Sequence, residues 1–89
     1  MIEDWDDYRI FLSVAENGTL KAAAAELKVN LSTVLRRINT FEEKMGVRLF
    51  DRSHDGFTLT SPGEIIKKHA SEMQHLVLDL MRKVKDADH

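Results

Sequence analysis

Apolar residues recur every three or four positions through most of the first half of the chain, which is the period of helices with one buried face. This pattern predicts three helices, over about 5–16, 20–27 and 31–45. Residues that favour helix ends bound them, with side-chain caps before each start and glycines after the first and third. The caps are Asp4, Thr19 and Asn30, and the glycines are Gly18 and Gly46.

After Gly46 the apolar residues alternate with polar ones, as they do in strands. Two short strands are predicted, over 47–50 and 56–60, with a turn signal at Asp55-Gly56, so the segment reads as a β-hairpin. Two strands cannot bury a core alone, so the hairpin must lean on the helices. Ser61 then caps a long helix predicted over about 62–86, with Pro62 at its first position.

Two helices joined by a short turn, the second longer, and then a hairpin describe a winged helix-turn-helix. The predicted fold class is therefore mainly α, with three helices, a small β-hairpin wing and a long C-terminal helix. We expect the helix-turn-helix at about 19–38 and the wing at about 47–60, within a domain over 1–61. Residues 62–89 are expected to form a linker and dimerisation helix.

Length and composition narrow the possible functions. Eighty-nine residues are enough for one small domain and exclude a second catalytic or sensory domain within this chain. No apolar run approaches the roughly 20 residues of a membrane span, and the first residues are acidic where a secretory signal would be basic, so we expect a cytoplasmic protein without a membrane partner. We expect no enzyme, because a glycine-rich phosphate loop and a nucleophile elbow are both lacking.

Metal, cofactor and base-stacking sites are also disfavoured. The chain has no cysteine, and His54, His69 and His75 form no pair at the i, i+4 spacing of a helical zinc site. We therefore expect no metal, no cofactor and no bound small molecule in these residues. The aromatic residues fall at core spacing and are interpreted as packing side chains: Trp5, Phe11, Phe41, Phe50 and Phe57.

Charge is distributed unevenly along the chain. The formal net charge is −2, yet residues 17–54 hold seven lysines and arginines against four acids, a local charge of +3, while residues 1–16 hold one arginine against five acids. A basic middle between acidic ends suits a small polyanion-binding face, because local charge sets the potential at a contact. The alternative is an ordinary solvated helix surface.

The run from Phe11 to Arg52 resembles the N-terminal DNA-binding domain of LysR-type bacterial transcriptional regulators. The resemblance rests on Ala15-Glu16-Asn17-Gly18-Thr19, Ala22-Ala23, Leu27, Val29, Arg36, Ile38, Phe41-Glu42, Gly46-Val47-Arg48-Leu49-Phe50-Asp51-Arg52, Leu59-Thr60 and Gly63. It implies a homodimer that binds double-stranded DNA sequence-specifically and regulates transcription, with the helix from Asn30 as the recognition helix. The chain departs from the family where Leu31-Ser32 replaces the common Gln-Pro and where Leu35 replaces the common Ser, so the operator of a relative cannot be transferred to it.

The candidate DNA-binding residues are Asn30, Leu31, Ser32, Thr33, Leu35, Arg36, Arg37, Arg52, Ser53 and His54. Arg36 is the best candidate for direct recognition, because a guanidinium can bind O6 and N7 of guanine; the alternative is a surface arginine paired with Glu42 or a phosphate. Leu31 either touches a thymine methyl or packs on the core. Arg37 is expected to meet phosphate or water.

For some of these candidates the alternatives are structural. Ser32 and Thr33 carry hydroxyls that could contact DNA or serve the first helical turn. Arg52 is either a phosphate clamp in the wing or an internal partner of Asp51 or Glu42. The resemblance places Arg52 to Asp55 at the wing tip.

The last predicted helix carries a heptad seam at spacings of 4, 3, 4, 3 and 4: Ile66, Ala70, Met73, Val77, Leu80 and Val84. A helix of this length cannot bury its far half on so small a body, which predicts a homodimer through the C-terminal helix. The alternatives are packing within the chain and a frayed tail.

The alternative to DNA binding is a winged-helix module that binds another protein. The negative net charge and the apolar residues Leu31 and Leu35 favour this alternative.

Overall fold

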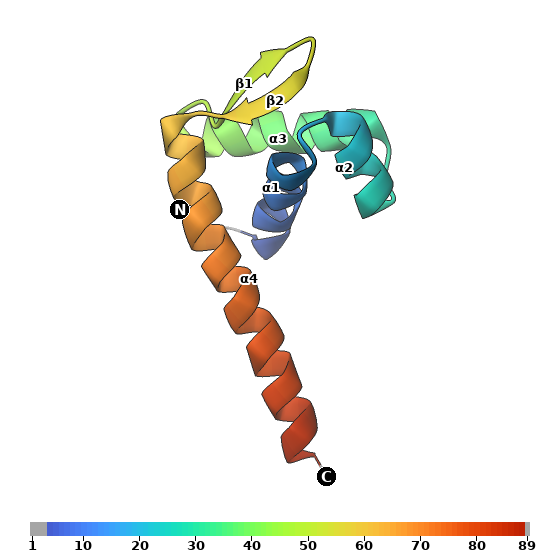
Figure 1. The fold of residues 1–89 in the computed structure, drawn as a ribbon, viewed down its shortest axis with the longest axis vertical. Helices are drawn as coiled ribbons and strands as arrows, with labels where there is room; N and C mark the ends of the chain where they lie inside the picture. Colours follow the sequence, from blue (N-terminus) through green and yellow to red (C-terminus); the bar gives the residue numbers. More distant parts are fainter. Residues whose placement is uncertain (1–3, 89) are drawn as a thin grey trace.

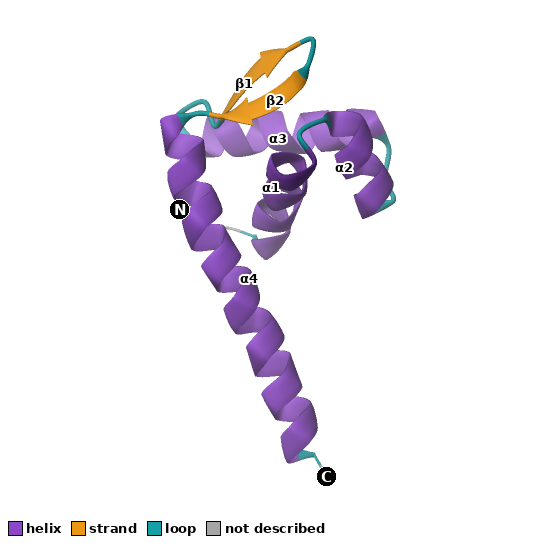
Figure 2. Cartoon of the chain, in the orientation of Figure 1, coloured by secondary structure: helices purple, strands orange, loops and turns teal. Residues whose placement is uncertain are grey.

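The computed structural model describes residues 4–88 and consists of four helices and one hairpin (Figure 1). The elements are α1 (Trp5–Asn17), α2 (Leu20–Leu27), α3 (Leu31–Met45), β1 (Phe50–Ser53), β2 (Gly56–Leu59) and α4 (Ser61–Ala87). The two strands form an antiparallel wing above α3, and α4 extends well beyond the other elements (Figure 2). The predicted winged helix-turn-helix followed by a long helix is confirmed.

The core is built around α1. Its residues Phe11 and Val14 are fully buried, and α2, α3, β1 and α4 each contribute buried side chains around them. Aromatic rings connect the layers, since Tyr8 meets Phe41 edge-on and Phe11 lies against both Phe41 and Phe50. Phe11, Phe41 and Phe50 are buried, and Trp5 and Phe57 are partly buried against the core, so the prediction that the aromatic residues are packing side chains is confirmed.

The helix ends follow the sequence closely. The side chain of Asp4 accepts a hydrogen bond from the amide of Asp6, and that of Thr19 accepts one from Ala22, so both are N-caps as predicted. Gly18 ends α1 with a φ of 78°, in the left-handed region that favours glycine. Asn30 occupies the N-cap position of α3, but its side chain makes no capping hydrogen bond.

The first strand differs from the prediction. Val47 and Arg48 lie in an exposed loop, and β1 begins at Phe50 and continues to Ser53. The physical reason is the carboxylate of Glu42, which accepts hydrogen bonds from the amides of Leu49 at 2.8 Å and Phe50 at 3.2 Å. The amides of Leu49 and Phe50 are therefore held by α3, and strand pairing begins at Phe50, which lies opposite Leu59.

The start of α4 is also corrected, by one residue. Thr60 is the N-cap in place of Ser61, and its hydroxyl accepts a hydrogen bond from the amide of Gly63 at 3.1 Å. The same hydroxyl donates to the carbonyl of Arg48 at 2.7 Å. Thr60 is preferred because it can satisfy the helix end and the incoming loop together, whereas Ser61 becomes the first helical residue.

The wing is fastened to the turn between α1 and α2. The amide of Phe57 donates to the carbonyl of Gly18 at 2.8 Å. Gly56 permits this approach, because a Cβ at this position would lie 2.2 Å from the same carbonyl oxygen and its φ is 133°. The wing is thus held by backbone contact near its turn and by Glu42 near its base.

The two halves of α4 have different surroundings. Gly63 and Ala70 are buried against the body, whereas every residue of α4 from Leu80 to Ala87 is exposed. Figure 1 shows this second half projecting away from the other elements. No helix within residues 4–88 is both long and apolar enough to cross a membrane.

Candidate nucleic-acid interface

The arrangement of α2 and α3 presents one helix face to the outside. Lys28 takes the left-handed conformation with a φ of 59° and turns the chain sharply after α2. Val34, Ile38 and Phe41 bury one side of α3 against the core. The opposite side is open, and the N-terminal half of α3 is free to enter a groove.

Arg36 lies on this open side. It is exposed, and it forms no ion pair with any residue between 4 and 88. The alternative of a pair with Glu42 does not occur, and Glu42 pairs with Arg52. Ser32 and Thr40 are exposed one turn before and one turn after Arg36. Together these residues form a polar strip along α3 with a guanidinium at its centre.

Arg37 has the opposite environment. Its Nη2 donates to Oδ1 of Asp7 at 2.8 Å, and its Nη1 lies 3.4 Å from Asp6. Lys44 reaches the other oxygen of Asp7 at 3.1 Å. This corrects the expectation that Arg37 meets phosphate or water: Arg37 fastens α3 to α1 and is not part of the candidate interface.

The Asp7 carboxylate, 7% exposed, holds this cluster together. Burial by itself raises the pKa of Asp7, but hydrogen bonds from Arg37 and Lys44 and the positive charges of both outweigh it, so the pKa lies below its ordinary value. The hydrogen bond to Asp7 in turn raises the pKa of Arg37. Asp7 is therefore an anion near neutral pH, and two basic side chains in the middle of the chain, Arg37 and Lys44, are paired within the protein.

Leu31 and Leu35 lie one turn apart on one flank of α3. Leu31 is 45% exposed and Leu35 is partly exposed, and neither belongs to the core or to the apolar side chains packed on it. The alternative in which Leu31 packs on the core is therefore wrong. Asn30 and Ser32 are exposed and Thr33 is partly exposed in the same first turn, next to Lys28.

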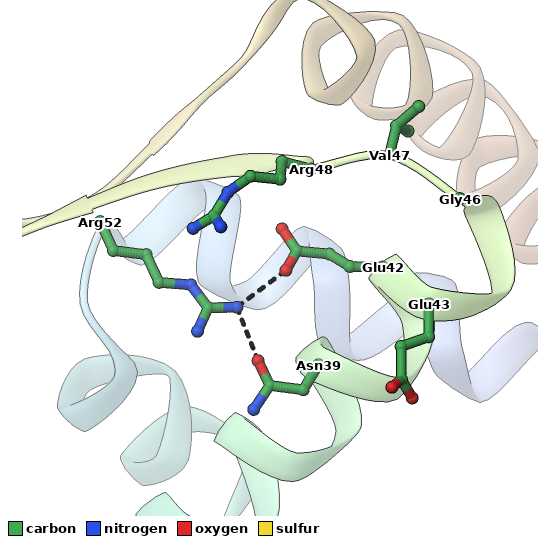
Figure 3. A pocket seen from close by; sticks show the side chains of 7 residues that line it. All are labelled: Asn39, Glu42, Glu43, Gly46, Val47, Arg48 and Arg52. Carbon is green, nitrogen blue, oxygen red and sulfur yellow. Dashed lines mark hydrogen bonds and ion pairs between the residues drawn. The ribbon is translucent and has the colours of Figure 1, made fainter.

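On β1, Arg52 is bound to partners within the protein. Its Nη2 donates to Glu42 at 2.8 Å and to Asn39 at 2.7 Å, and its guanidinium lies 5.0 Å from the centre of the Phe57 ring (Figure 3). The internal pair with Glu42 is thus the alternative that the structure adopts for Arg52. Figure 3 also shows Arg48 directed into the same groove between α3 and the loop before β1.

The wing tip consists of exposed polar residues. The hydroxyl of Ser53 accepts a hydrogen bond from the amide of Asp55 at 3.2 Å, which supports the two-residue turn. His54 and Asp55 form that turn and are exposed. Ser53 and His54 thus lie at the end of the hairpin farthest from α4 (Figure 1), where they could reach a groove next to the one that α3 enters.

The heptad seam of α4 is divided between two environments. Ala70 is 1% exposed, Ile66 packs on the core, and Met73 lies beside both in an apolar depression next to Tyr8. The first half of the seam therefore packs within the chain, which corrects the assignment of Ala70 to a dimer contact. Val77, Leu80 and Val84 continue the same helix side but are exposed.

The side chains that hold Arg37 and Arg52 inside the protein could not be identified from the sequence pattern. Asp7, Lys44 and Asn39 were not singled out, although Lys44 follows Arg37 by seven positions and so shares its side of α3. That spacing indicates that Arg37 and Lys44 share an environment, but it does not identify Asp7 as the carboxylate that binds both. Among residues 4–88, no three histidines or acids are grouped so that they could hold a metal ion.

The helices, the wing and the open side of α3 together define a winged helix-turn-helix domain. The chain belongs to the lysR family of bacterial regulatory helix-turn-helix proteins, whose family model matches residues 5–64. Similar proteins include the HTH-type transcriptional regulator ClcR of Pseudomonas putida, 37% identical over 76% of this chain and 23% of the relative. The HTH-type transcriptional regulator YofA of Bacillus subtilis is 35% identical over 80% of this chain and 25% of the relative. The chain spans about a quarter of the length of these curated relatives.

Solved structures share the fold. The chain is similar to that in the crystal structure of the CbnR_DBD-DNA complex, with 29% identity, a TM-score of 0.87, and coverage of 98% of this chain and 100% of that one. The BenM_DBD/benA site 1 DNA complex gives a TM-score of 0.89 at 22% identity, over 96% of this chain and 99% of that one, and so supports the fold alone. The resemblance stated from the sequence is confirmed.

Proposed function

We propose that this chain binds double-stranded DNA sequence-specifically and serves as the DNA-binding part of a transcription regulator. The observation that carries the proposal is Arg36, an exposed guanidinium without an ion pair to any described residue, on the open side of a helix-turn-helix. Membership of the lysR family and the likeness to a chain solved in complex with DNA support it.

In this proposal α3 enters the major groove with its N-terminal half. Arg36 forms two hydrogen bonds with O6 and N7 of a guanine, and Ser32 and Thr33 contact base edges or phosphates. Asn30 contacts a phosphate beside Lys28 at the entrance to the helix. Ser53 and His54 approach the backbone or the adjacent groove from the wing tip.

Duplex titrations at several salt concentrations test this proposal. Phosphate neutralisation makes the logarithm of the affinity fall linearly with the logarithm of the salt concentration, by about 0.9 per phosphate contacted. We expect such a slope, and tighter binding to a sequence selected from random duplexes than to the random pool. An interaction that requires a protein partner instead would leave both duplexes unbound at low salt.

We further propose that two copies associate through α4. Its 27 residues extend for about 40 Å, far more than the body can cover. The exposed apolar residues Val77, Leu80 and Val84 continue the side that Ile66 and Ala70 bury in the first half. Removing this stripe from water requires a second apolar surface, and an identical helix related by two-fold symmetry supplies one.

Sedimentation tests the dimer. Val77→Glu places a charge in the proposed seam and should weaken association by several kcal/mol while the winged body stays folded. Leu78→Glu is the matched control, because Leu78 is also exposed on α4 but lies one residue off the stripe, about 100° around the helix from Val77. A parent protein that sediments as a monomer at tens of micromolar, or equal effects of the two variants, would refute the seam.

A further inference from the structure

Two leucines on α3 lie outside the hydrophobic core, Leu31 exposed and Leu35 partly exposed. Leu31 and Leu35 are spaced by one helical turn and so lie on the same flank. Both lie outside the core and outside the apolar side chains that pack on it, and Leu31 is nearly half exposed. Val29, also exposed, lies just before them in the turn between α2 and α3. An apolar patch is therefore presented at the end of α3 that the helix-turn-helix directs outward.

The surroundings of this patch are cationic. Lys28 precedes it and Arg36 follows Leu35 directly, and neither forms an ion pair within the part of the chain that the structure describes. Such a border attracts a polyanion and disfavours a purely apolar partner. The occupant that fits must therefore carry negative charge around an apolar group.

Thymine supplies that combination in duplex DNA. Its C5 methyl is the apolar group displayed in the major groove, between the phosphates of the two strands. Leucine has no donor or acceptor with which to satisfy the polar edges of guanine, adenine or cytosine, so covering those edges leaves them without water or a partner. A leucine at a base-reading position thus favours thymine by attraction and disfavours the other bases by desolvation.

We infer that Leu31 and Leu35 read thymine methyl groups, so that the DNA sequence preferred by this chain carries thymines beside the guanine contacted by Arg36. This inference rests on the proposed function and adds the chemical feature that the site recognises. The discrimination is made by shape and burial, because a leucine side chain has no group that could form a hydrogen bond with a base edge.

Removal of one methyl group from the DNA provides the test. Sites are selected from random duplexes with the whole chain, and each thymine in turn is replaced by uracil, which removes only the methyl. We expect uracil at one or two positions to weaken binding about fourfold each, the effect of one buried methyl group. Replacement of cytosine by 5-methylcytosine at a mismatched position should recover part of the loss.

The protein side of the test uses Leu31→Ala and Leu35→Ala. Both leucines lie outside the core, so each variant should keep the parent's thermal unfolding, and each should lose the thymine-to-uracil difference at one position. Leu78→Ala on α4 is the matched control and should retain both differences. Equal binding of thymine and uracil duplexes by the parent would overturn the inference while leaving the proposed function intact, and would leave a protein as the candidate occupant.

A thymine preference that survives in both leucine variants would overturn the assignment to these two residues. Failure of the parent to bind any duplex would remove the proposed function and this inference with it. The two failures are distinguished by whether the selected thymine duplex is bound at all.

Discussion

Arg36 and Arg37 are adjacent and chemically identical, yet the structure gives them opposite roles. Arg37 turns toward α1 and is held by the buried carboxylate of Asp7, whereas Arg36 turns outward and is paired with no residue between 4 and 88. Successive helix residues differ by about 100° in direction, so neighbours in the sequence can belong to different environments. A local count of lysines and arginines therefore overstates the positive charge available to a bound polyanion, because some of these cations are already paired within the protein.

The two sides of α3 can be compared further. The side facing α1 carries Arg37 and Lys44, both bound to Asp7, and the side facing out carries Ser32 and Arg36. Substitutions on the first side should change the free energy of unfolding, and those on the second should change DNA binding. The following predictions test this separation.

The largest effect is expected at Asp7. Asp7→Ala removes the carboxylate from two cations and should lower the free energy of unfolding by about 2 to 4 kcal/mol. This lies toward the lower end of the roughly 3 to 5 kcal/mol lost when a buried pair is broken, because Lys44 reaches solvent. Urea denaturation at pH 7 measures it. Asp6→Ala is the control, since Asp6 is more exposed and surface pairs contribute about 0 to 1 kcal/mol. Equal losses in both variants would contradict the buried clamp.

Next in size is the effect of Arg36 on recognition. Arg36→Ala should weaken binding to the selected site by about 1 to 3 kcal/mol and relax the preference at one base pair, because a bidentate guanine contact is lost. Its thermal unfolding should match that of the parent. Arg37→Ala is the matched comparison and should show the reverse, with lower stability and an unchanged base preference. If Arg37→Ala were the variant that relaxed the preference, the two roles would have to be exchanged.

A smaller effect is expected from pH. Because the folded pKa of Asp7 lies below its unfolded value, its contribution to stability is complete above the ordinary aspartate pKa, near 4, and is lost as pH falls through the folded value. The difference in unfolding free energy between the parent and Asp7→Asn should be constant from pH 5 to 7 and shrink below about pH 4. A difference that grew on acidification would contradict the lowered pKa.

The smallest expected effect is on the salt dependence of DNA binding, which should differ between Lys28 and Arg52, two cations outside the Asp7 cluster. Lys28→Ala should weaken binding to specific and random duplexes alike. It should also reduce the slope of log affinity against log salt concentration by about 0.9, the value for one phosphate. Arg52 is held by Glu42 and Asn39, so Arg52→Ala should leave the slope unchanged and lower the melting temperature. A reduced slope for Arg52→Ala would show that this arginine leaves its internal partners for DNA.

Much of the fold could be predicted because its signals are local. The period of apolar residues placed all three helices of the body, and the caps at Asp4 and Thr19 and the glycines at 18 and 46 placed most of their ends. The family resemblance followed from the same stretch. The start of β1 could not be predicted in this way, because the side chain that holds Leu49 and Phe50 comes from Glu42 on another element.

The candidate interface was predicted in kind, but not residue by residue. The family resemblance, together with helical spacing, placed Leu31, Ser32, Leu35 and Arg36 at the accessible end of α3, and the structure leaves Leu35 partly exposed and the other three exposed. The same reasoning included Arg37 and Arg52, whose exposure depends on acids 30 and 10 positions away. Ala70 shows the same limit in α4, since its place in the seam is a matter of spacing and its burial depends on the body packed beside it.

The sequence by itself determined the order of the elements, their period and the types of side chain that each displays, because helix formation, capping and turns depend on neighbours within about one turn of the chain. Only the tertiary structure decided which charges stay available. An ion pair depends on distances between elements, and α1 happens to bring Asp7 to Arg37 while nothing between residues 4 and 88 pairs with Arg36. The separation of a structural cation from a recognition cation, one residue apart, therefore arises from packing.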